Sequence, residues 1–170
     1  MVKGLKNPSS PVTISFSIGE TAPNTYTQEQ INLQLNVLDQ EVFVVTGVNL
    51  DLLPPDAIAG VNTRTRGQLS STSRTSIGNL SQTNIIAVAR DDIRAAGFVD
   101  GGVGFSASFG ESPAVGMDYL GIIATNDFFV AVEGAGNGGA KALTGKLYGY
   151  RAIADAATFA ALTQSELLSS

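Results

Sequence analysis

The chain has 170 residues and a net charge of −5; 44% of its residues are hydrophobic and only 15% are charged. It contains neither cysteine nor histidine, which excludes disulfides, cysteine-based zinc sites and Ser-His-Asp catalysis. The excess of acids argues against nucleic-acid binding, because phosphate contacts need clustered Lys and Arg. Nineteen glycines instead indicate one domain in which many strands are joined by tight turns.

The N-terminal segment MVKGLKNPSS lacks the apolar core of a secretory signal, and the chain contains no run of about eighteen apolar residues. We therefore expect no secretory signal, no membrane span, and synthesis in the cytosol. Residues 1–10 are predicted to form an extended arm, and residues 11–170 to form a single domain.

Apolar and polar residues alternate in three segments of the first third of the chain, a period typical of half-buried β-strands. Strands are predicted over 11–20, 30–38 and 41–53, and Pro54–Pro55 ends the third because proline cannot donate to a ladder. The residues expected on the buried faces are Val12, Ile14, Phe16 and Ile18 in the first strand, Ile31, Leu33, Leu35 and Val37 in the second, and Val42, Val44, Val48, Leu50 and Leu52 in the third.

The Thr-, Ser- and Arg-rich segment 61–76 has two interpretations. It is either a pair of exposed edge strands, which threonine favours, or a long surface loop with a binding function; we favour the edge strands. The segment 84–90 is apolar enough for a core strand. After it, Asp91 or Asp92 as N-cap and Gly97 as terminator predict one helical turn.

The second half of the chain predicts further strands and one helix. The helix covers residues 156–168, with Asp155 as its N-cap and with Phe159, Leu162 and Leu167 on one face that docks on the sheet or on a neighbouring subunit. The expected strands are 103–110, a hairpin of 119–124 and 128–133 joined at 125–127, and a last long strand over 141–153 in which Gly145 and Gly149 indicate bulges.

About eight to ten short strands and one helix predict an all-β fold. We expect a single antiparallel β-sandwich, in jelly-roll form, with a short C-terminal helix. A doubly wound α/β fold would need a helix after nearly every strand, and the sequence does not predict those helices.

The glycine-rich stretch 134–139 matches the G-x-G-x-x-G pattern of dinucleotide-binding loops, and Asp155 follows about twenty residues later. That motif has to open a helix, whereas the segment after it contains two further glycines and favours a strand. The Gly-Lys-Ser/Thr core of a P-loop is also missing. We therefore predict a flexible turn at this point and no cofactor.

The remaining charged and aromatic groups predict surface roles. Three acidic pairs, Asp91 with Asp92, Asp51 with Asp56 and Asp118 with Asp127, do not have EF-hand spacing, and each acid is expected to be solvated or to cap a helix. We assign no catalytic residue and no metal ligand, and leave open only a structural calcium at a subunit contact. Solvated surface is likewise expected for Lys3, Lys6, Arg64, Arg66 and Arg74, and boundary packing for Tyr148 and Tyr150, which could otherwise form a sugar-binding platform or an interface anchor.

In its overall pattern of strands, flat faces of small residues, N-terminal arm and helical tail, the whole chain resembles the jelly-roll coat and decoration proteins of viruses and phages. That resemblance implies a structural subunit of a viral capsid or similar shell, not an enzyme, which assembles symmetrically with copies of itself and with other shell proteins in the virion. The arm carries only Lys3 and Lys6, whereas many genome-facing coat proteins have a basic arm. The resemblance therefore favours an outer or membrane-facing shell position, without direct nucleic-acid contact.

A carbohydrate- or ligand-binding β-sandwich module is the alternative function. The absence of tryptophan and the presence of only four tyrosines count against it, because sugar sites usually present aromatic platforms.

Overall fold

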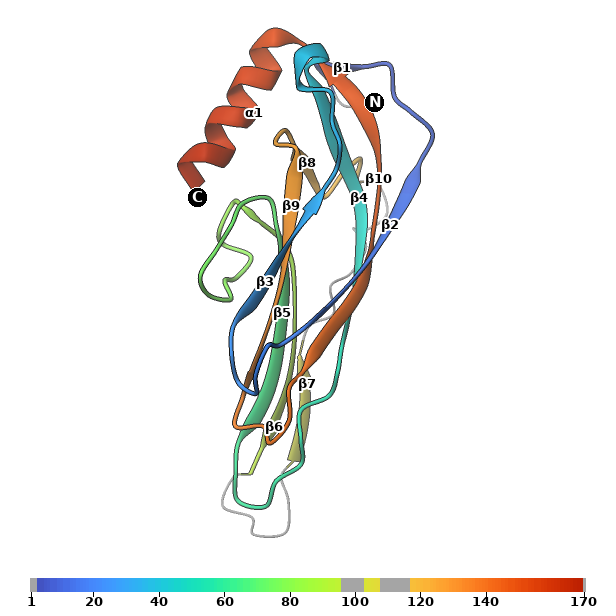
Figure 1. Ribbon diagram of the computed structural model, residues 1–170. Helices are drawn as coiled ribbons and strands as arrows, with labels where there is room; N and C mark the ends of the chain where they lie inside the picture. The colour runs from blue at the N-terminus through green and yellow to red at the C-terminus, as the bar shows by residue number, and fades with distance from the viewer. Residues whose placement is uncertain (1–2, 96–102, 108–116, 170) are drawn as a thin grey trace.

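Two antiparallel β-sheets face each other in the computed structural model, with one helix at one end of the sandwich (Figure 1). The structure describes residues 3–95, 103–107 and 117–169. The strands of the first sheet are β1 (Leu5–Lys6), β2 (Val12–Gly19), β4 (Glu41–Leu52), β8 (Gly121–Ile123) and β10 (Ala142–Ala154). Those of the second are β3 (Thr27–Asn32), β5 (Thr63–Ser70), β6 (Ile85–Arg94), β7 (Val103–Ala107) and β9 (Asp127–Ala135), and the helix is α1 (Ala156–Ser169).

The strands pair in a nested order. β2 pairs with β10, β3 with β9, β4 with β8 and β5 with β6, so early strands pair with late ones and the innermost pair lies in the middle of the chain. β10 also pairs with β4, and β9 with β5, which joins the pairs into two sheets. A hairpin-like ribbon rolled in this way is a jelly roll. The predicted fold class is confirmed.

The core lies between the sheets and consists of side chains at alternating strand positions. Phe16 of β2 and Phe128 of β9 meet edge to face with ring centroids 6.2 Å apart, a favoured aromatic geometry. As predicted, Phe16 and Ile18 are buried while Ser15 and Ser17 are exposed. The buried set comprises Phe16, Ile18, Leu33, Leu35, Phe43, Val45, Val48, Leu69, Ala87, Ile123, Phe128, Val130, Val132, Leu143 and Leu147.

A β-bulge in β4 corrects the predicted single buried face of that strand. The register shifts from Gly47 opposite Tyr148 to Val45 opposite Gly149, so Thr46 has no partner. An extra residue reverses which side chains face the core. Val48 therefore belongs to the main core with Phe43 and Val45. Val42 and Val44 were expected on the same face as Val48, but they lie in a second buried cluster on the other face of the same sheet.

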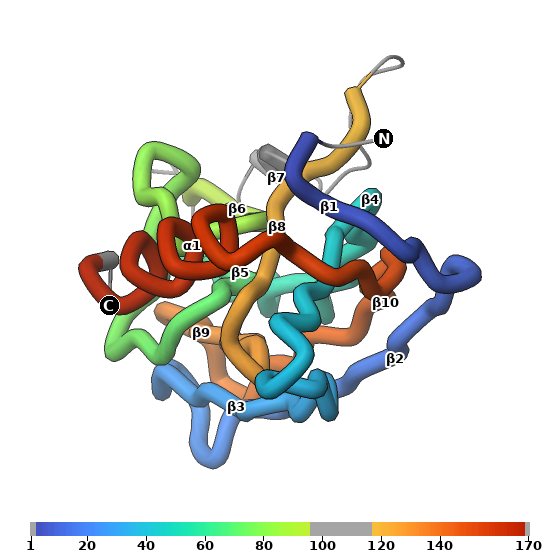
Figure 2. The backbone as a smooth tube through the Cα atoms, turned by 90° about the horizontal axis from the view of Figure 1, so that it is seen from above, coloured from blue at the N-terminus to red at the C-terminus, as the bar shows by residue number. Residues whose placement is uncertain are grey.

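α1 covers that second cluster. Asp155 caps the helix as predicted, accepting a hydrogen bond from the Thr158 backbone N–H at 2.7 Å. Phe159 and Leu162 pack against a buried set formed by Leu5, Val42, Val44, Ala124, Ala152 and Ala154. Leu167 was expected on the same face but is 66% exposed, and Glu166 is buried in its place. α1 also lies beside the connection between β5 and β6 in both views (Figure 2).

Part of the predicted arm 1–10 is bound to its own chain. Leu5 and Lys6 pair with Ala154 and Ile153 as the short strand β1, and Leu5 is buried. Ser9 and Arg151 exchange hydrogen bonds, from the Ser9 N–H to the Arg151 carbonyl and from the Arg151 N–H to the Ser9 hydroxyl. A hydrophobic anchor at Leu5 thus holds the described part of the arm against β10.

Three other predictions about strands were wrong because pairing in space overrode local pattern. The segment predicted as edge strands contains β5, which lies between β9 and β6 with Thr63 and Thr65 buried. Asp91 and Asp92 belong to β6 instead of starting a helical turn. β8 and β9 do not form the predicted hairpin, since each lies in a different sheet.

The predicted strand 30–38 is shifted and shortened. The structure has β3 over Thr27–Asn32, after which Gln34 adopts a positive φ of 54°. Leu33 and Leu35 are buried as predicted, while Val37 begins a short 3₁₀ turn and is exposed. Gly149 lies at the register shift, as predicted, but the ladder runs through Gly145 without one. Gly97 and residues 108–110 lie outside the described residues.

Candidate interaction surfaces

The glycine-rich stretch 134–139 forms the predicted turn. It runs from β9 directly into β10 and opens no helix, and Asp155 caps α1 instead of facing the turn. The buried carboxylate of Glu20 accepts hydrogen bonds from the backbone N–H groups of Gly134 and Lys141, both at 2.7 Å, and of Thr25 at 2.9 Å. Glu20 thus holds both sides of the turn in place.

A second set of polar groups completes this end of the sandwich. The Asp56 carboxylate lies 2.6 Å from the Lys141 ammonium and also accepts the N–H groups of Gly138 and Gly139 at 3.0 Å. The bond to Lys141 is the main reason why the pKa of Asp56 is lowered. These groups satisfy one another, and within the described residues no three acids gather as a metal site. Their arrangement is that of a structural lock.

Tyr148 and Tyr150 lie on the outer face of β10 but do not form an open platform. Both rings are half-buried. Tyr150 packs in the cluster beneath α1, while the Tyr148 hydroxyl accepts a hydrogen bond from the Asn49 amide at 3.3 Å. Their position fits the boundary packing expected from the sequence.

Four arginines lie on the outer face of the second sheet, and we call this group, Arg64, Arg66, Arg90 and Arg94, the arginine face. In the strand register, Arg66 lies directly opposite Arg90, and Arg64 opposite Asp92. On its other side Arg66 faces Glu133, with 3.6 Å between the guanidinium and the carboxylate. Burial, and next the charges of Arg64 and Arg90, lower the pKa of Arg66.

The sequence analysis did not predict this surface. It expected Arg64 and Arg66 to be solvated, and it did not connect them with Arg90 and Arg94, which come from a strand that is distant in sequence and adjacent in space. Arg74, which was also expected to be solvated, lies elsewhere and donates to the Ser76 carbonyl and the Asn84 side-chain oxygen. The signal that could have found the group is that two arginines occupy positions of the same parity on each of the two strands, 64 and 66 on β5 and 90 and 94 on β6, so each pair shares one face of its strand.

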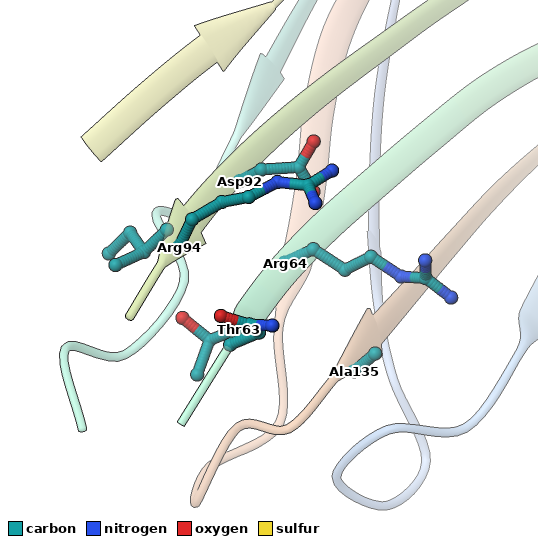
Figure 3. A pocket seen from close by; sticks show the side chains of 7 residues that line it. Thr63, Arg64, Asp92, Arg94 and Ala135 are labelled. Atoms are coloured by element: carbon teal, nitrogen blue, oxygen red, sulfur yellow. The ribbon is translucent and has the colours of Figure 1, made fainter. Parts of the chain in front are cut away.

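A small cavity of about 180 Å³ opens at one end of the arginine face. In Figure 3 the Arg94 side chain extends toward Asp92, while Arg64 points away across the sheet toward β9. The cavity is lined by Asn62, Thr63, Arg64, Asp92, Ile93, Arg94 and Ala135.

A second surface lies on α1. An apolar groove runs along one flank of the helix, beginning at Phe159, and its two leucines, Leu167 and Leu168, are 66% and 78% exposed. We call this the α1 groove; it is lined by Phe159, Ala160, Thr163, Gln164, Leu167 and Leu168. Within the part of the chain that the structure describes, α1 does not combine the length and the apolar character that crossing a membrane requires.

Glu166 holds the C-terminal half of α1 to the sandwich. Its buried carboxylate accepts the backbone N–H groups of Ala124 at 2.8 Å and Thr125 at 3.0 Å. Burial is the main cause that raises the pKa of the Glu166 carboxyl above its ordinary value of 4.5. The local sequence pattern does not predict this role, since a glutamate near a helix end is normally solvated.

Glu166→Ala is expected to lower the free energy of unfolding by about 1–3 kcal/mol, because a buried N–H loses its acceptor. The difference from the wild type should depend on pH. Since the pKa of Glu166 is raised in the folded state, the folded chain binds the Glu166 proton more tightly than the unfolded chain does. This proton binding adds to the free energy of unfolding at low pH, and the added stability is lost as pH rises from 4.5 through the folded-state pKa. Urea unfolding should therefore give a larger difference near pH 5 than near pH 8. An equal difference at both pH values would contradict this account.

Comparisons with known proteins place the chain beside viral structures. No family model matches it, and no curated protein does. A chain of Desmodium yellow mottle tymovirus is 9% identical with a TM-score of 0.27, and 89% of this chain and 92% of that one are covered. A chain of the VP1 pentamer of human polyomavirus 6 is 9% identical with a TM-score of 0.40, and 87% of this chain and 98% of that one are covered. A chain of turnip yellow mosaic virus is 9% identical with a TM-score of 0.32, and 86% of this chain and 96% of that one are covered.

At such identities and TM-scores these neighbours carry no argument about this chain. The fold assignment rests on the nested strand pairing of the chain itself.

Proposed function

We propose that this chain is a structural subunit of a viral capsid or similar protein shell, and that it acts by assembling with copies of itself. The observation that carries the proposal is the α1 groove. Phe159 and Leu162 already attach the helix to the first sheet, so Leu167 and Leu168 are not needed for that contact. Adjacent leucines that remain exposed on an anchored helix are typical of a subunit contact.

One fold serves many functions, so the proposal is argued from the surfaces of the chain and not from its fold. The polar lock around Glu20 and Asp56 has no open set of ligands, and the two tyrosines on β10 offer no exposed platform. These features favour assembly over the alternative, a carbohydrate- or ligand-binding module. The place of action would be the virion, with the chain made in the host cytoplasm.

Light scattering coupled to size-exclusion chromatography, with negative-stain imaging at high concentration, tests the proposal. We expect wild-type chain to form particles or defined oligomers, and Leu167→Lys with Leu168→Lys to raise the concentration needed for half-assembly by about tenfold or more. Leu53→Lys is the matched control, because Leu53 is 48% exposed but follows β4 at the other end of the sandwich (Figure 1).

A chain that stays monomeric at every concentration would overturn the proposal. Binding to a glycan array by that monomer would establish the alternative. If the control reduced assembly as much as the double variant, the α1 groove would lose its assigned role.

A further inference from the structure

The outer edge of β2 is open. All eight residues of β2 pair with β10 in an unbroken register, without a bulge. Within the described residues β2 has no strand on its other side, and Figure 2 shows it at the margin of the molecule. One edge of its backbone is therefore available to a further strand.

Three residues direct their backbone groups out of this edge. Glu20, which follows β2, donates its N–H to the Lys141 carbonyl, so the even-numbered positions bond to β10. Residues of an antiparallel ladder alternate in this respect, and the N–H and C=O groups of Thr13, Ser15 and Ser17 therefore point away from β10. In the part of the chain that the structure describes, these groups have no backbone partner.

β2 also lacks the features that keep edge strands from pairing. Its sequence, VTISFSIG, contains no charged residue and no proline, whereas edge strands are normally protected by one of these, by a bulge or by short length. Two other edge strands have such protection, since β3 carries the exposed Glu29 and β8 has only three residues. A long, uncharged and regular edge is suited to receive another strand.

We propose that β2 of one subunit pairs antiparallel with β2 of a second copy of this chain, around a two-fold axis at Ser15. The inference rests on the proposed function and specifies one contact of the assembly. Ser15 is midway between Pro11, which has no N–H, and Gly19, where the strand ends, so this axis uses the whole edge. Thr13 of each copy then lies opposite Ser17 of the other. Each opposed pair exchanges two backbone hydrogen bonds, which joins the two first sheets into one.

The side chains of this pairing match on both of its faces. On the solvent-facing side, only hydroxyl side chains lie opposite one another. On the other side, Ile14 lies opposite Phe16 of the second copy, and Val12, which is 38% exposed in the subunit, lies opposite Ile18. Hydroxyl pairs and pairs of aromatic with β-branched residues are among those that stabilise neighbouring strands. The β2 edge is thus complementary to itself.

Charge permits two copies to meet at this edge. Each subunit has a net charge of −5, and the strands that would touch carry none of it. Of the β10 residues that face β2, Lys146 is the charged one, and it lies opposite Ser15. In the joined sheet the two copies of Lys146 are three strand spacings apart, about 14 Å. That distance exceeds the Debye length of about 8 Å at physiological salt, so their repulsion is screened.

Cysteine at the axis tests the pairing directly, because the chain contains no cysteine. In Ser15→Cys the two substituted residues lie opposite each other with Cα atoms about 5.5 Å apart, which a disulfide can span. Ser17→Cys is the matched control. Ser17 is also exposed, but its two copies lie four residues apart along the strands, about 14 Å. After mild oxidation, a non-reducing gel should show about tenfold more covalent dimer for Ser15→Cys.

Two double variants test which residues lie opposite each other. Thr13→Lys with Ser17→Lys places like charges across the contact twice, whereas Thr13→Lys with Ser17→Glu places opposite charges there. The first variant should need about a tenfold higher concentration for half-assembly than the second. Both substituted positions are exposed, so both variants should keep a urea midpoint close to that of the wild type.

The outcomes separate this inference from the proposed function. Wild-type assembly in which Ser15→Cys cross-links no more than Ser17→Cys would overturn the β2 pairing and leave the shell function standing. Equal assembly by the two double variants would have the same consequence, because a different partner or a different register would then cover the edge. A wild-type chain that stays monomeric at every concentration would remove both proposals.

Discussion

Replacing Glu20 with alanine is expected to lower the free energy of unfolding by about 3–6 kcal/mol. Glu20 is buried and accepts three backbone N–H groups, of which those of Gly134 and Lys141 are buried. Each buried donor left without an acceptor costs about 1–3 kcal/mol. The loss of the third bond, to Thr25, and of the turn geometry adds to this cost.

Glu20→Gln is the control that separates hydrogen bonding from packing. One Glu20 oxygen accepts the Thr25 and Gly134 N–H groups, and the other accepts that of Lys141. Glutamine can keep the first oxygen but places an NH₂ donor against the Lys141 N–H, so an intermediate loss of about 1–3 kcal/mol is expected. Urea unfolding measures both variants. A Glu20→Ala loss below about 1 kcal/mol would show that the carboxylate does not hold the turn.

Gly149→Ala is expected to cost at least about 3 kcal/mol, at the upper limit of what overpacking does. A Cβ atom at Gly149 would lie 2.2 Å from the Val44 carbonyl oxygen and 2.6 Å from the Phe43 ring. The carbonyl belongs to the β4 backbone and the ring is fully buried. Neither can move without separating β4 from β10, the pair that holds the centre of the first sheet.

The matched control is Gly19→Ala at the end of β2. A Cβ atom there would meet only the Lys141 carbonyl oxygen, at 4.0 Å, so its urea midpoint should stay close to that of the wild type. If Gly149→Ala does not accumulate as folded protein, its cost exceeds the stability of the chain, which agrees with the expectation. Equal midpoints for the two variants would contradict it.

The local sequence pattern predicted the buried side chains correctly where burial alternated regularly along a strand. The alternation in β2 predicted that Phe16 and Ile18 enter the core, although Val12 at the start of the strand is exposed, and Asp155 predicted the start of α1. In β4 the same reasoning failed at one residue. Thr46 looks like an ordinary polar position, and only the pairing with β10 makes it the extra residue of a bulge.

The candidate surfaces were less accessible to sequence reasoning than the fold. The arginine face needed the register that brings Arg90 opposite Arg66, and the α1 groove needed the docking of the helix through Phe159 and Leu162. Leu167 was placed on the docked face because it continues the helical spacing. The buried contacts of Glu166 with Ala124 and Thr125 take that place instead.

Alternation and capping act between neighbouring residues, so the amino-acid sequence was sufficient to predict an antiparallel β-sandwich with a C-terminal helix. The strand pairing was needed to show which strands are central, which side of β4 faces the core, and which arginines meet. These outcomes depend on hydrogen bonds between segments far apart in the chain, such as β5 with β9 and β4 with β10. A strand such as β5, rich in threonine and arginine, appears peripheral until its neighbours on both sides are known.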